Sequence, residues 1–287
     1  MEKLEGKPVT NVIKSVQCFL RRCLFLVLSF GPIPKHIAFI MDGNRRYAKR
    51  RNMKEGSGHS VGYAALITML QYCYEMGVKY VTVYAFSIDN FKRKPEEVQS
   101  LMNLMMVKID ELLDKKSIVH EFGLKINFWG NLDLLTEPVR LAAEKAMAST
   151  INNSGPVLSI CVAYTSTNEI IRAINKTCAR NKERIPQACI NCDGDLLADS
   201  INSSISIVDL EENLDTANCP DPDIVIRTSG EARLSNFLLW QTTLSHLQNP
   251  SPLWPEFSLR NLIWSILEYQ KVYSYLEAGR RRAKKDN

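Results

Sequence analysis

The feature that most restricts the fold of this chain is a regular alternation of β-branched, apolar segments with amphipathic segments, from residue 36 to residue 227. A strand, a helix and another strand in succession form the repeating unit of a parallel sheet covered by helices. We therefore predict an α/β fold, a single domain with a mainly parallel central sheet flanked by helices. Strands are expected at 36–41, 78–86, 124–129, 157–163 and 224–227, and helices at 58–76, 95–116, from about 137, and at 168–180.

A proline-containing break at 31–34 separates an N-terminal segment from the domain proper. The polar stretch 181–222 is interpreted as a surface excursion with a short helix near 208–214, and a final helix is expected at about 258–275. We expect an N-terminal membrane-interface or partner-docking segment at 1–31, a folded domain at 32–278 and a basic tail at 279–287.

The N-terminal segment mixes an apolar run at 23–30 with Lys14, Arg21 and Arg22. A transmembrane helix needs about 20 apolar residues, so this run is too short to span a bilayer. An amphipathic helix that lies at a membrane interface or docks on a partner fits the pattern. A helix that merely caps the domain is the alternative.

The composition is that of a folded globular protein, with 45% hydrophobic and 23% charged residues. The formal charge of +5 favours anionic ligands or surfaces without requiring nucleic acid. Eight cysteines follow no secretory signal and are expected to be reduced. Cys189 and Cys192 form a lone CxxC pair without the further ligands of a zinc site, so we do not expect one.

Three segments that directly follow predicted strands, at 41–46, 86–93 and 226–235, combine small polar residues with arginines. Ligands of open parallel sheets lie beyond the carboxyl ends of the strands, so these segments should share one site. Guanidinium groups bind phosphate oxygens in pairs, and Asp42 supplies the carboxylate that Mg²⁺ prefers. The three segments together predict an anion site, although each alone is compatible with arginines in a solvated loop.

Several phosphate-binding motifs are excluded. The glycines at 56–62 read GxGxxxG and follow a basic loop, so they do not form a dinucleotide fingerprint, although His59 at a helix start could donate to an anion. The chain has no GxxxxGK[ST] loop. Asp42 has no aspartate two residues away, as phosphatases of the DxDG type require, and no Asp-Asp dipeptide occurs.

Taken together, the motifs resemble those of cis-prenyltransferases, the family of undecaprenyl and dehydrodolichyl diphosphate synthases and plant rubber transferases. The resemblance covers about residues 32–275. It implies an undecaprenyl diphosphate synthase-like fold and a catalytic domain that condenses isopentenyl diphosphate with an allylic diphosphate. The motifs that carry it are HIAFIMDGNRR at 36–46, Gly58-His59, YAFSIDNF at 84–91, IRTSGEARLSNFLLWQ at 226–241 and LWPE at 253–256.

The resemblance also implies the site residues. Asp42 would carry Mg²⁺ and help to ionise the allylic diphosphate, with His59 and Asn90 as polar helpers. The resemblance assigns Arg227, Arg233 and Ser235 to the isopentenyl diphosphate site, supported by Arg93. The remaining substrate-binding positions are Gly43, Asn44, Arg45, Arg46, Tyr47, Ser87 and Phe91. Apolar residues at 98–113 are expected to line a product tunnel, a pattern that an ordinary core would share.

Some positions depart from the family pattern. Bacterial members have glycine at the position of Arg45, arginine at that of Glu55 and a metal-binding glutamate at that of His246; Glu55 weakens the allylic cluster, and His246 is not assigned as a ligand. The terminal R-x-G motif of homodimeric members is absent. The resemblance therefore implies a catalytic subunit with a Nogo-B-receptor-like, non-catalytic partner at the cytosolic face of the endoplasmic reticulum, the cytosol or a lipid or rubber particle being the alternative.

Two functions other than catalysis would be expected to leave different features in the sequence. A non-catalytic scaffold of the same fold would be expected to lose Asp42 or the Arg227 and Arg233 pair, yet all three are present. A nucleic-acid binder would interleave arginines with stacking aromatics over an open surface, and that pattern is weak here. Product length is not encoded in any motif.

Overall fold

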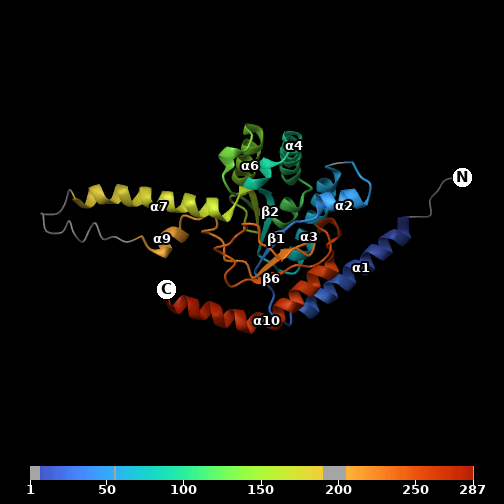
Figure 1. Cartoon of the computed structure of the whole chain (residues 1–287). Helices are drawn as coiled ribbons and strands as arrows, with labels where there is room; N and C mark the ends of the chain where they lie inside the picture. Colours follow the sequence, from blue (N-terminus) through green and yellow to red (C-terminus); the bar gives the residue numbers. More distant parts are fainter. Residues whose placement is uncertain (1–6, 55, 190–204, 287) are drawn as a thin grey trace.

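A computed structural model describes residues 7–54, 56–189 and 205–286, and the side-chain surroundings of residues 15–54, 56–180 and 205–283. Its centre is one six-stranded parallel sheet in the order β3-β4-β2-β1-β5-β6 (Figure 1). The α/β fold predicted from the alternating pattern is confirmed. The strands are β1 (His36–Ile40), β2 (Tyr80–Ser87), β3 (Lys125–Trp129), β4 (Val157–Tyr164), β5 (Ile224–Arg227) and β6 (His246–Gln248).

The register brings the carboxyl ends of the central strands to one edge. Ile40 at the end of β1 pairs with Tyr84 on one side and with Arg227 on the other. Because Asp42 follows β1 directly, the segments after β1, β2 and β5 meet at this edge. This is the arrangement that the sequence predicted for the anion site.

Side chains of the inner strands alternate between two hydrophobic cores. In β1, Ile37 and Phe39 belong to the larger core, and Ala38 and Ile40 to the smaller one. The larger core packs the sheet against α3 (Ser57–Glu75), α4 (Pro95–Leu112), α5 (Ile118–Phe122), α6 (Glu137–Thr150) and the first half of α10 (Leu259–Asp286). The smaller core lies on the other face, where Phe237 and Leu238 cover the sheet.

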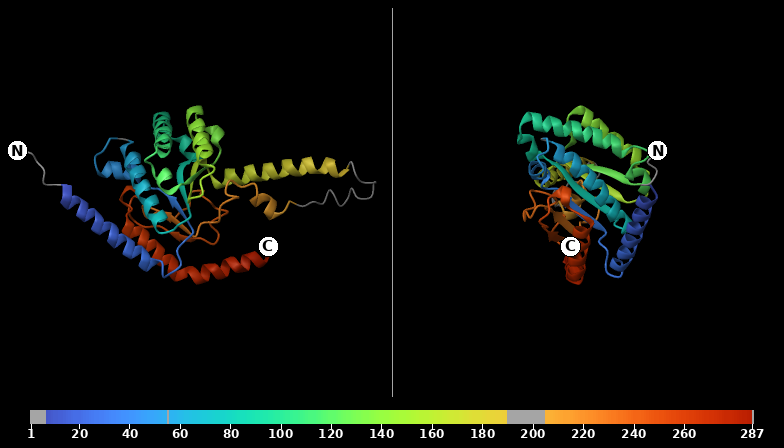
Figure 2. Two further views of the ribbon diagram at one scale, coloured as in Figure 1. Left: turned by 180° about the vertical axis from the view of Figure 1, so that it is seen from behind. Right: turned by 90° about the vertical axis from the view of Figure 1, so that its right-hand side faces the viewer.

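One long helix extends beyond this body. α7 (Ser166–Cys189) projects from the sheet as an arm, and the short helix α9 (Ile207–Glu211) packs against its middle, where Thr177 donates to the Asp209 carbonyl (Figures 1 and 2). The short helix expected near 208–214 is therefore present. Glu55 and Cys192 lie outside the described residues.

Several elements differ from the sequence prediction. The helices and strands not predicted include α2 (Asn44–Arg50), which follows β1 closely, and β6. The helix α10 runs eleven residues beyond Tyr275, to Asp286. Arg280 fixes this extension, since it donates to Asp223 at 2.6 Å. The described residues also form three short 3-10 helices: η1 (Ile88–Lys92), η2 (Leu132–Leu134) and η3 (Trp254–Glu256).

The N-terminal helix α1 (Lys7–Leu28) is both docked and exposed. Phe25 and Leu28 are buried in the larger core, and Arg21 forms an ion pair with Glu75 of α3 at 2.8 Å. Its other side leaves an apolar stripe in solvent: Val16, Phe19, Leu20, Cys23, Val27 and Phe30. Within the described ranges, no helix combines the length and apolar character needed to cross a membrane.

Candidate active site

The centre of the site is an ion pair between the first and last segments of the chain that reach the sheet edge. Arg227, the last residue of β5, donates from Nη2 to Asp42 Oδ2 at 2.7 Å. The backbone behind this pair is also tied together, because Thr228 Oγ1 donates to the Asp42 carbonyl at 2.7 Å and accepts from the Asp42 amide at 3.0 Å. Asp42 and Arg227 are therefore held in fixed positions before any ligand arrives.

Asp42 is kept ionised by its neighbours. Burial opposes the charge of this half-buried carboxyl, but hydrogen bonds and positive charge from Arg227 and Arg46 outweigh it and hold the pKa of Asp42 below its ordinary value. Arg46 Nη2 lies 3.2 Å from Asp42 Oδ1. An anionic oxygen donor surrounded by guanidinium groups suits a cation and a diphosphate together.

A second group of contacts links Arg46 to the loop after β5. Arg46 donates to Ser229 Oγ at 2.6 Å and lies 3.7 Å from Glu231, which also pairs with Arg233. Arg227 continues the network, since its Nη1 donates to Ser235 Oγ at 2.5 Å and to the Arg233 carbonyl at 2.6 Å. The residues expected to bind isopentenyl diphosphate thus lie beside those expected to bind the allylic diphosphate.

The opposite side of the site is formed by the segment after β2 and the start of α3. Asn90 accepts from the Ser87 amide at 3.0 Å, in a capping box that fixes η1. Burial lowers the pKa of His59, and the nearby charge of Arg93 lowers it further, so the imidazole is neutral at pH 7. Glu97 of α4 holds Arg93 at 2.8 Å and Arg45 at 3.5 Å.

Two glycines let α3 approach the site closely. A Cβ on Gly58 would lie 2.1 Å from the Asn44 carbonyl, and one on Gly62 would lie 2.1 Å from Asn44 Oδ1. Trp254 closes the contact by donating from Nε1 to the Gly62 carbonyl at 2.8 Å. The GxGxxxG pattern at 56–62 therefore serves close packing of the helix start against Asn44.

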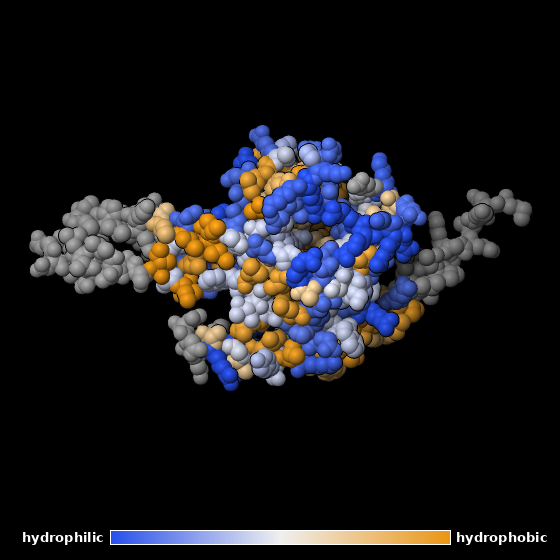
Figure 3. Space-filling view, in the orientation of Figure 1, coloured by the Kyte–Doolittle hydropathy of each residue, from blue (hydrophilic) through white to orange (hydrophobic). Residues whose placement is uncertain are grey.

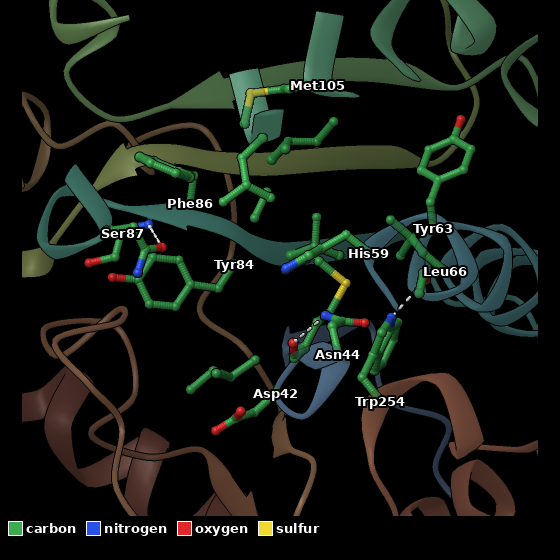
Figure 4. Close-up of a pocket in the computed structure, with 18 of the residues that line it drawn as sticks. Asp42, Asn44, His59, Tyr63, Leu66, Tyr84, Phe86, Ser87, Met105 and Trp254 are labelled. Atoms are coloured by element: carbon green, nitrogen blue, oxygen red, sulfur yellow. Dashed lines mark hydrogen bonds between the residues drawn. The ribbon is translucent and has the colours of Figure 1, made fainter. Parts of the chain in front are cut away.

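A cavity of about 690 Å³ opens at this charged edge and runs between the sheet and the helices α3 and α4. In Figure 4, Asp42 lies at one end of the drawn residues, Phe86 and Met105 lie at the other, and Tyr84 and His59 lie between them. The deep part is apolar, as expected for residues 98–113. Its lining includes Leu66, Leu70, Phe86, Leu101, Leu104, Met105, Ile109, Leu112, Phe128 and Ile160.

The structure brings most of the predicted site residues together. Gly43 has φ +110°, a left-handed conformation that favours glycine, and begins α2. Tyr47 packs against Arg51, and the ring centroids of Phe91 and Phe86 lie 4.9 Å apart. The side chains of Tyr47 and Phe91 do not line the cavity. The residues that do line it are Asp42, Asn44, Arg45, His59, Ser87, Asn90, Arg93, Arg227, Arg233 and Ser235.

Sequence reasoning overlooked the carboxylates and hydroxyls that orient the arginines. Glu97 and Glu231 each hold two guanidinium groups, and Ser229 accepts from Arg46. A signal existed for Glu97, because it follows Arg93 by four residues at a helix start. Glu231 carries no such signal, since its partner Arg46 lies far away in the sequence.

His246 lies away from this edge. It pairs with Ile224 at the beginning of β5, whereas Arg227 is the last residue of β5 and Asp42 lies just past the end of β1. Among the described residues, no group of three or more histidine, cysteine, aspartate or glutamate side chains is placed to hold a metal ion. In the described part of this chain, two aspartates line the cavity, Asp42 and Asp89.

Comparisons with known proteins identify the family of the chain. A family model described as putative undecaprenyl diphosphate synthase matches residues 40–275. A dehydrodolichyl diphosphate synthase of Solanum lycopersicum is 52% identical over 99% of this chain and 100% of its own length. A dehydrodolichyl diphosphate synthase complex subunit of Homo sapiens is 42% identical over 88% of this chain and 72% of its own length.

One solved structure extends the comparison to three dimensions. Lavandulyl diphosphate synthase from Lavandula x intermedia, in complex with dimethylallyl diphosphate, matches with a TM-score of 0.70 and 27% identity. The match covers 83% of this chain and 95% of that one. The sheet and its flanking helices are therefore shared with a protein that holds an allylic diphosphate.

Proposed function

The chain belongs to the undecaprenyl diphosphate synthase family of prenyltransferases, and from that premise we propose how its site works and on what it acts. It is a cis-prenyltransferase, an enzyme of cis-prenyl chain elongation. We propose that it adds isopentenyl diphosphate units to an allylic diphosphate such as farnesyl diphosphate. The product would be a long-chain polyprenyl diphosphate for dolichol or rubber-type polyisoprenoids.

The observation that carries this proposal is the junction of a charged mouth with a long apolar cavity. The mouth holds fixed positive charge from Arg45, Arg93, Arg227 and Arg233, which matches two diphosphate groups side by side. The apolar interior behind Tyr84 matches the hydrocarbon chain that grows from one of them.

The proposed reaction begins when the C–O bond of the allylic diphosphate breaks and diphosphate leaves. The double bond of isopentenyl diphosphate attacks the allylic cation, a C–C bond forms, and loss of a proton creates the new cis double bond. Arginines placed before the reaction stabilise the leaving diphosphate without reorganisation. Neutral His59 can donate one hydrogen bond to a diphosphate oxygen.

Mg²⁺ is part of this proposal, and the donor set fits it. Mg²⁺ is commonly bound by one or two carboxylates, with substrate phosphate oxygens and water completing its coordination, and ionised Asp42 supplies the carboxylate. When bound, the ion would supply positive charge against the leaving diphosphate.

We also propose that the chain works with a Nogo-B-receptor-like, non-catalytic partner. The human relative is named a complex subunit, and this chain exposes an apolar surface on α7 and α9. We call this surface the α7–α9 patch; it comprises Ile171, Ile174, Ile207 and Val208, which are 44–59% exposed. Figure 3 shows hydrophobic side chains gathered over α7 and α9. Such a patch is typical of a protein interface.

The location proposed for the chain is the cytosolic face of the endoplasmic reticulum membrane. The apolar stripe on α1 supports attachment to a membrane surface, because an amphipathic helix can bury one face among lipid headgroups. A lipid or rubber particle presents the same chemistry, and the cytosol is the alternative if the stripe binds no lipid.

The function is tested by incorporation of radiolabelled isopentenyl diphosphate with farnesyl diphosphate and Mg²⁺, for the chain alone and with the partner. We expect partner-dependent long-chain product, and a loss of about 100-fold or more in Asp42→Ala, because the variant loses the ionised carboxylate. Ile171→Asp should lower the partner's effect and spare any basal activity. Full activity of the chain alone would reject the partner, and no product under any pairing would favour a scaffold.

A further inference from the structure

The loop that carries Arg233 and Ser235 has an unusual backbone. Four of its non-glycine residues have positive φ: Ser229 at 74°, Ser235 at 48°, Asn236 at 60° and Leu238 at 46°. Non-glycine residues in this region are strained, and they persist only where surrounding contacts determine the conformation. The contacts that hold this loop therefore determine where Arg233 and Ser235 lie.

Asn236 provides the first set of contacts, with the start of α7. Its carbonyl accepts from the Ser166 amide at 2.8 Å, and its Oδ1 accepts from the Thr167 amide at 3.0 Å and the Thr167 hydroxyl at 3.1 Å. Ser166 Oγ in turn accepts from the Leu239 amide at 3.0 Å. Asn236 thus acts as an N-cap for α7, although it lies 69 residues from Thr167 in the sequence.

Buried polar groups one turn into α7 provide the second set. Glu169 is 1% exposed, and its Oε2 accepts from the Tyr164 hydroxyl at 2.5 Å and from Gln241 Nε2 at 3.2 Å. Gln241 also donates to Thr216 Oγ1 at 2.8 Å. The loop is therefore fixed at its far end by α7, while Arg227 fixes its near end through Ser235 Oγ and the Arg233 carbonyl.

We propose that Asn236 is a positioning residue for the isopentenyl half of the reaction, because it clamps the loop of Arg233 and Ser235 to the N-terminus of α7. This inference rests on the proposed function, which assigns these two residues to isopentenyl diphosphate. Ser166 and Thr167 are the helix side of the clamp.

The two halves of the site depend on Asn236 to different degrees. The side chain of Arg233 is 64% exposed and pairs with Glu231 of the same loop, so the loop backbone sets its position. The allylic half is built on other elements, since Asn44 and Arg45 lie on α2, His59 lies on α3, and Asn90 lies on η1. Loss of the clamp should therefore weaken one substrate and spare the other.

The test compares three variants of the full chain, assayed with its partner where activity requires one. Asn236→Ala removes the capping oxygen, Asn236→Asp keeps one, and Asn261→Ala removes an oxygen of the same kind at the start of α10, where it accepts from the Ser258 amide and hydroxyl. We expect Asn236→Ala to raise the KM for isopentenyl diphosphate about tenfold and to change the KM for farnesyl diphosphate by less than about twofold. Asn236→Asp should bring the KM for isopentenyl diphosphate most of the way back to the natural value, and Asn261→Ala should leave both KM values unchanged.

A readout independent of turnover separates this inference from the proposed function. Amide hydrogen exchange at 233–241 should be faster in Asn236→Ala than in the natural chain, and inorganic pyrophosphate should bind more weakly. Equal changes in both KM values, or unchanged exchange, would overturn the clamp. If the natural chain incorporates no isopentenyl diphosphate, the proposed function fails, while exchange and pyrophosphate binding still decide the clamp.

Discussion

His36 shows how a motif residue can be structural. It opens the motif that ends at the site, yet its ring is buried at the start of β1, at the opposite end of the strand. Nδ1 lies 2.6 Å from the Pro220 carbonyl, which can only accept, so this nitrogen donates. Nε2 lies 2.8 Å from Thr82 Oγ1 and accepts from that hydroxyl. Both ring nitrogens are thus satisfied in the neutral form.

This burial makes stability depend on pH. Burial lowers the pKa of His36 to about 4, so below its ordinary value of 6.5 the unfolded chain takes up a proton that the folded chain does not. Between pH 7 and pH 5 the free energy of unfolding should therefore fall by about 2 kcal/mol more in the natural chain than in His36→Gln. Urea unfolding at the two pH values measures this. His120→Gln, on an exposed site, should keep the natural slope; equal slopes in all three would refute the assignment.

Among the helices, α3 contains two glycines, Gly58 and Gly62, that allow its close contact with the site. Alanine in place of a helical glycine normally stabilises a protein by up to about 1 kcal/mol. At Gly58 and Gly62 the added methyl group would instead meet Asn44 at 2.1 Å. The two contacts differ in kind, because Gly58 faces the Asn44 backbone and Gly62 faces its side-chain oxygen.

This difference predicts two distinct variants. Gly58→Ala must move the backbone, so we expect a loss of about 1–3 kcal/mol in stability together with a loss of activity. Gly62→Ala displaces the Asn44 side chain, and the helical gain offsets part of its cost. We expect its melting temperature to change little while the KM for farnesyl diphosphate rises roughly tenfold. Thr68→Ala, on the exposed side of α3, is the control; a Gly62→Ala variant with natural kinetics would contradict the contact.

The strands and helices differ in how well the sequence predicts them. Central strands such as 224–227 were predicted correctly because continuous apolar runs between turn residues leave few alternatives. The edge strand β6 was missed because its three residues include two polar ones and depend on pairing with β5. α2 was missed because Asp42-Gly43-Asn44 reads as a turn, whereas Gly43 uses its positive φ to begin a helix.

For the site, the sequence supplied the residues but not their partners. Segments at three strand ends were expected to meet because the carboxyl ends of parallel strands share one edge. The ion pair between Asp42 and Arg227 spans 185 residues, and no local pattern encodes it. The same holds for Asn236, whose role depends on a helix start far away in the sequence. Long-range contacts of this kind arise from the completed fold.

At the scale of the whole molecule, α1 stands out because it exposes a stripe of apolar side chains to solvent. Its apolar stripe leaves Phe19 65% and Leu20 60% exposed, while Phe25 and Leu28 anchor the other side in the core. Removing the entire segment would expose that core and confuse loss of binding with loss of folding. Substitutions in the exposed stripe avoid this problem.

We therefore expect the double variant Phe19→Asp, Leu20→Asp to fold normally and to lose membrane binding. Burial of an apolar side chain contributes about 1.5–3 kcal/mol, so loss of two should weaken binding at least about tenfold, even after allowance for partial burial. Co-sedimentation with vesicles of phosphatidylcholine and phosphatidylserine measures the change. The matched control is Leu141→Asp, Ile151→Asp near α6, where two apolar side chains of similar exposure, 51% and 61%, lie on another part of the surface. If both double variants sediment like the natural chain, α1 does not bind the membrane, and the stripe is left to a protein partner.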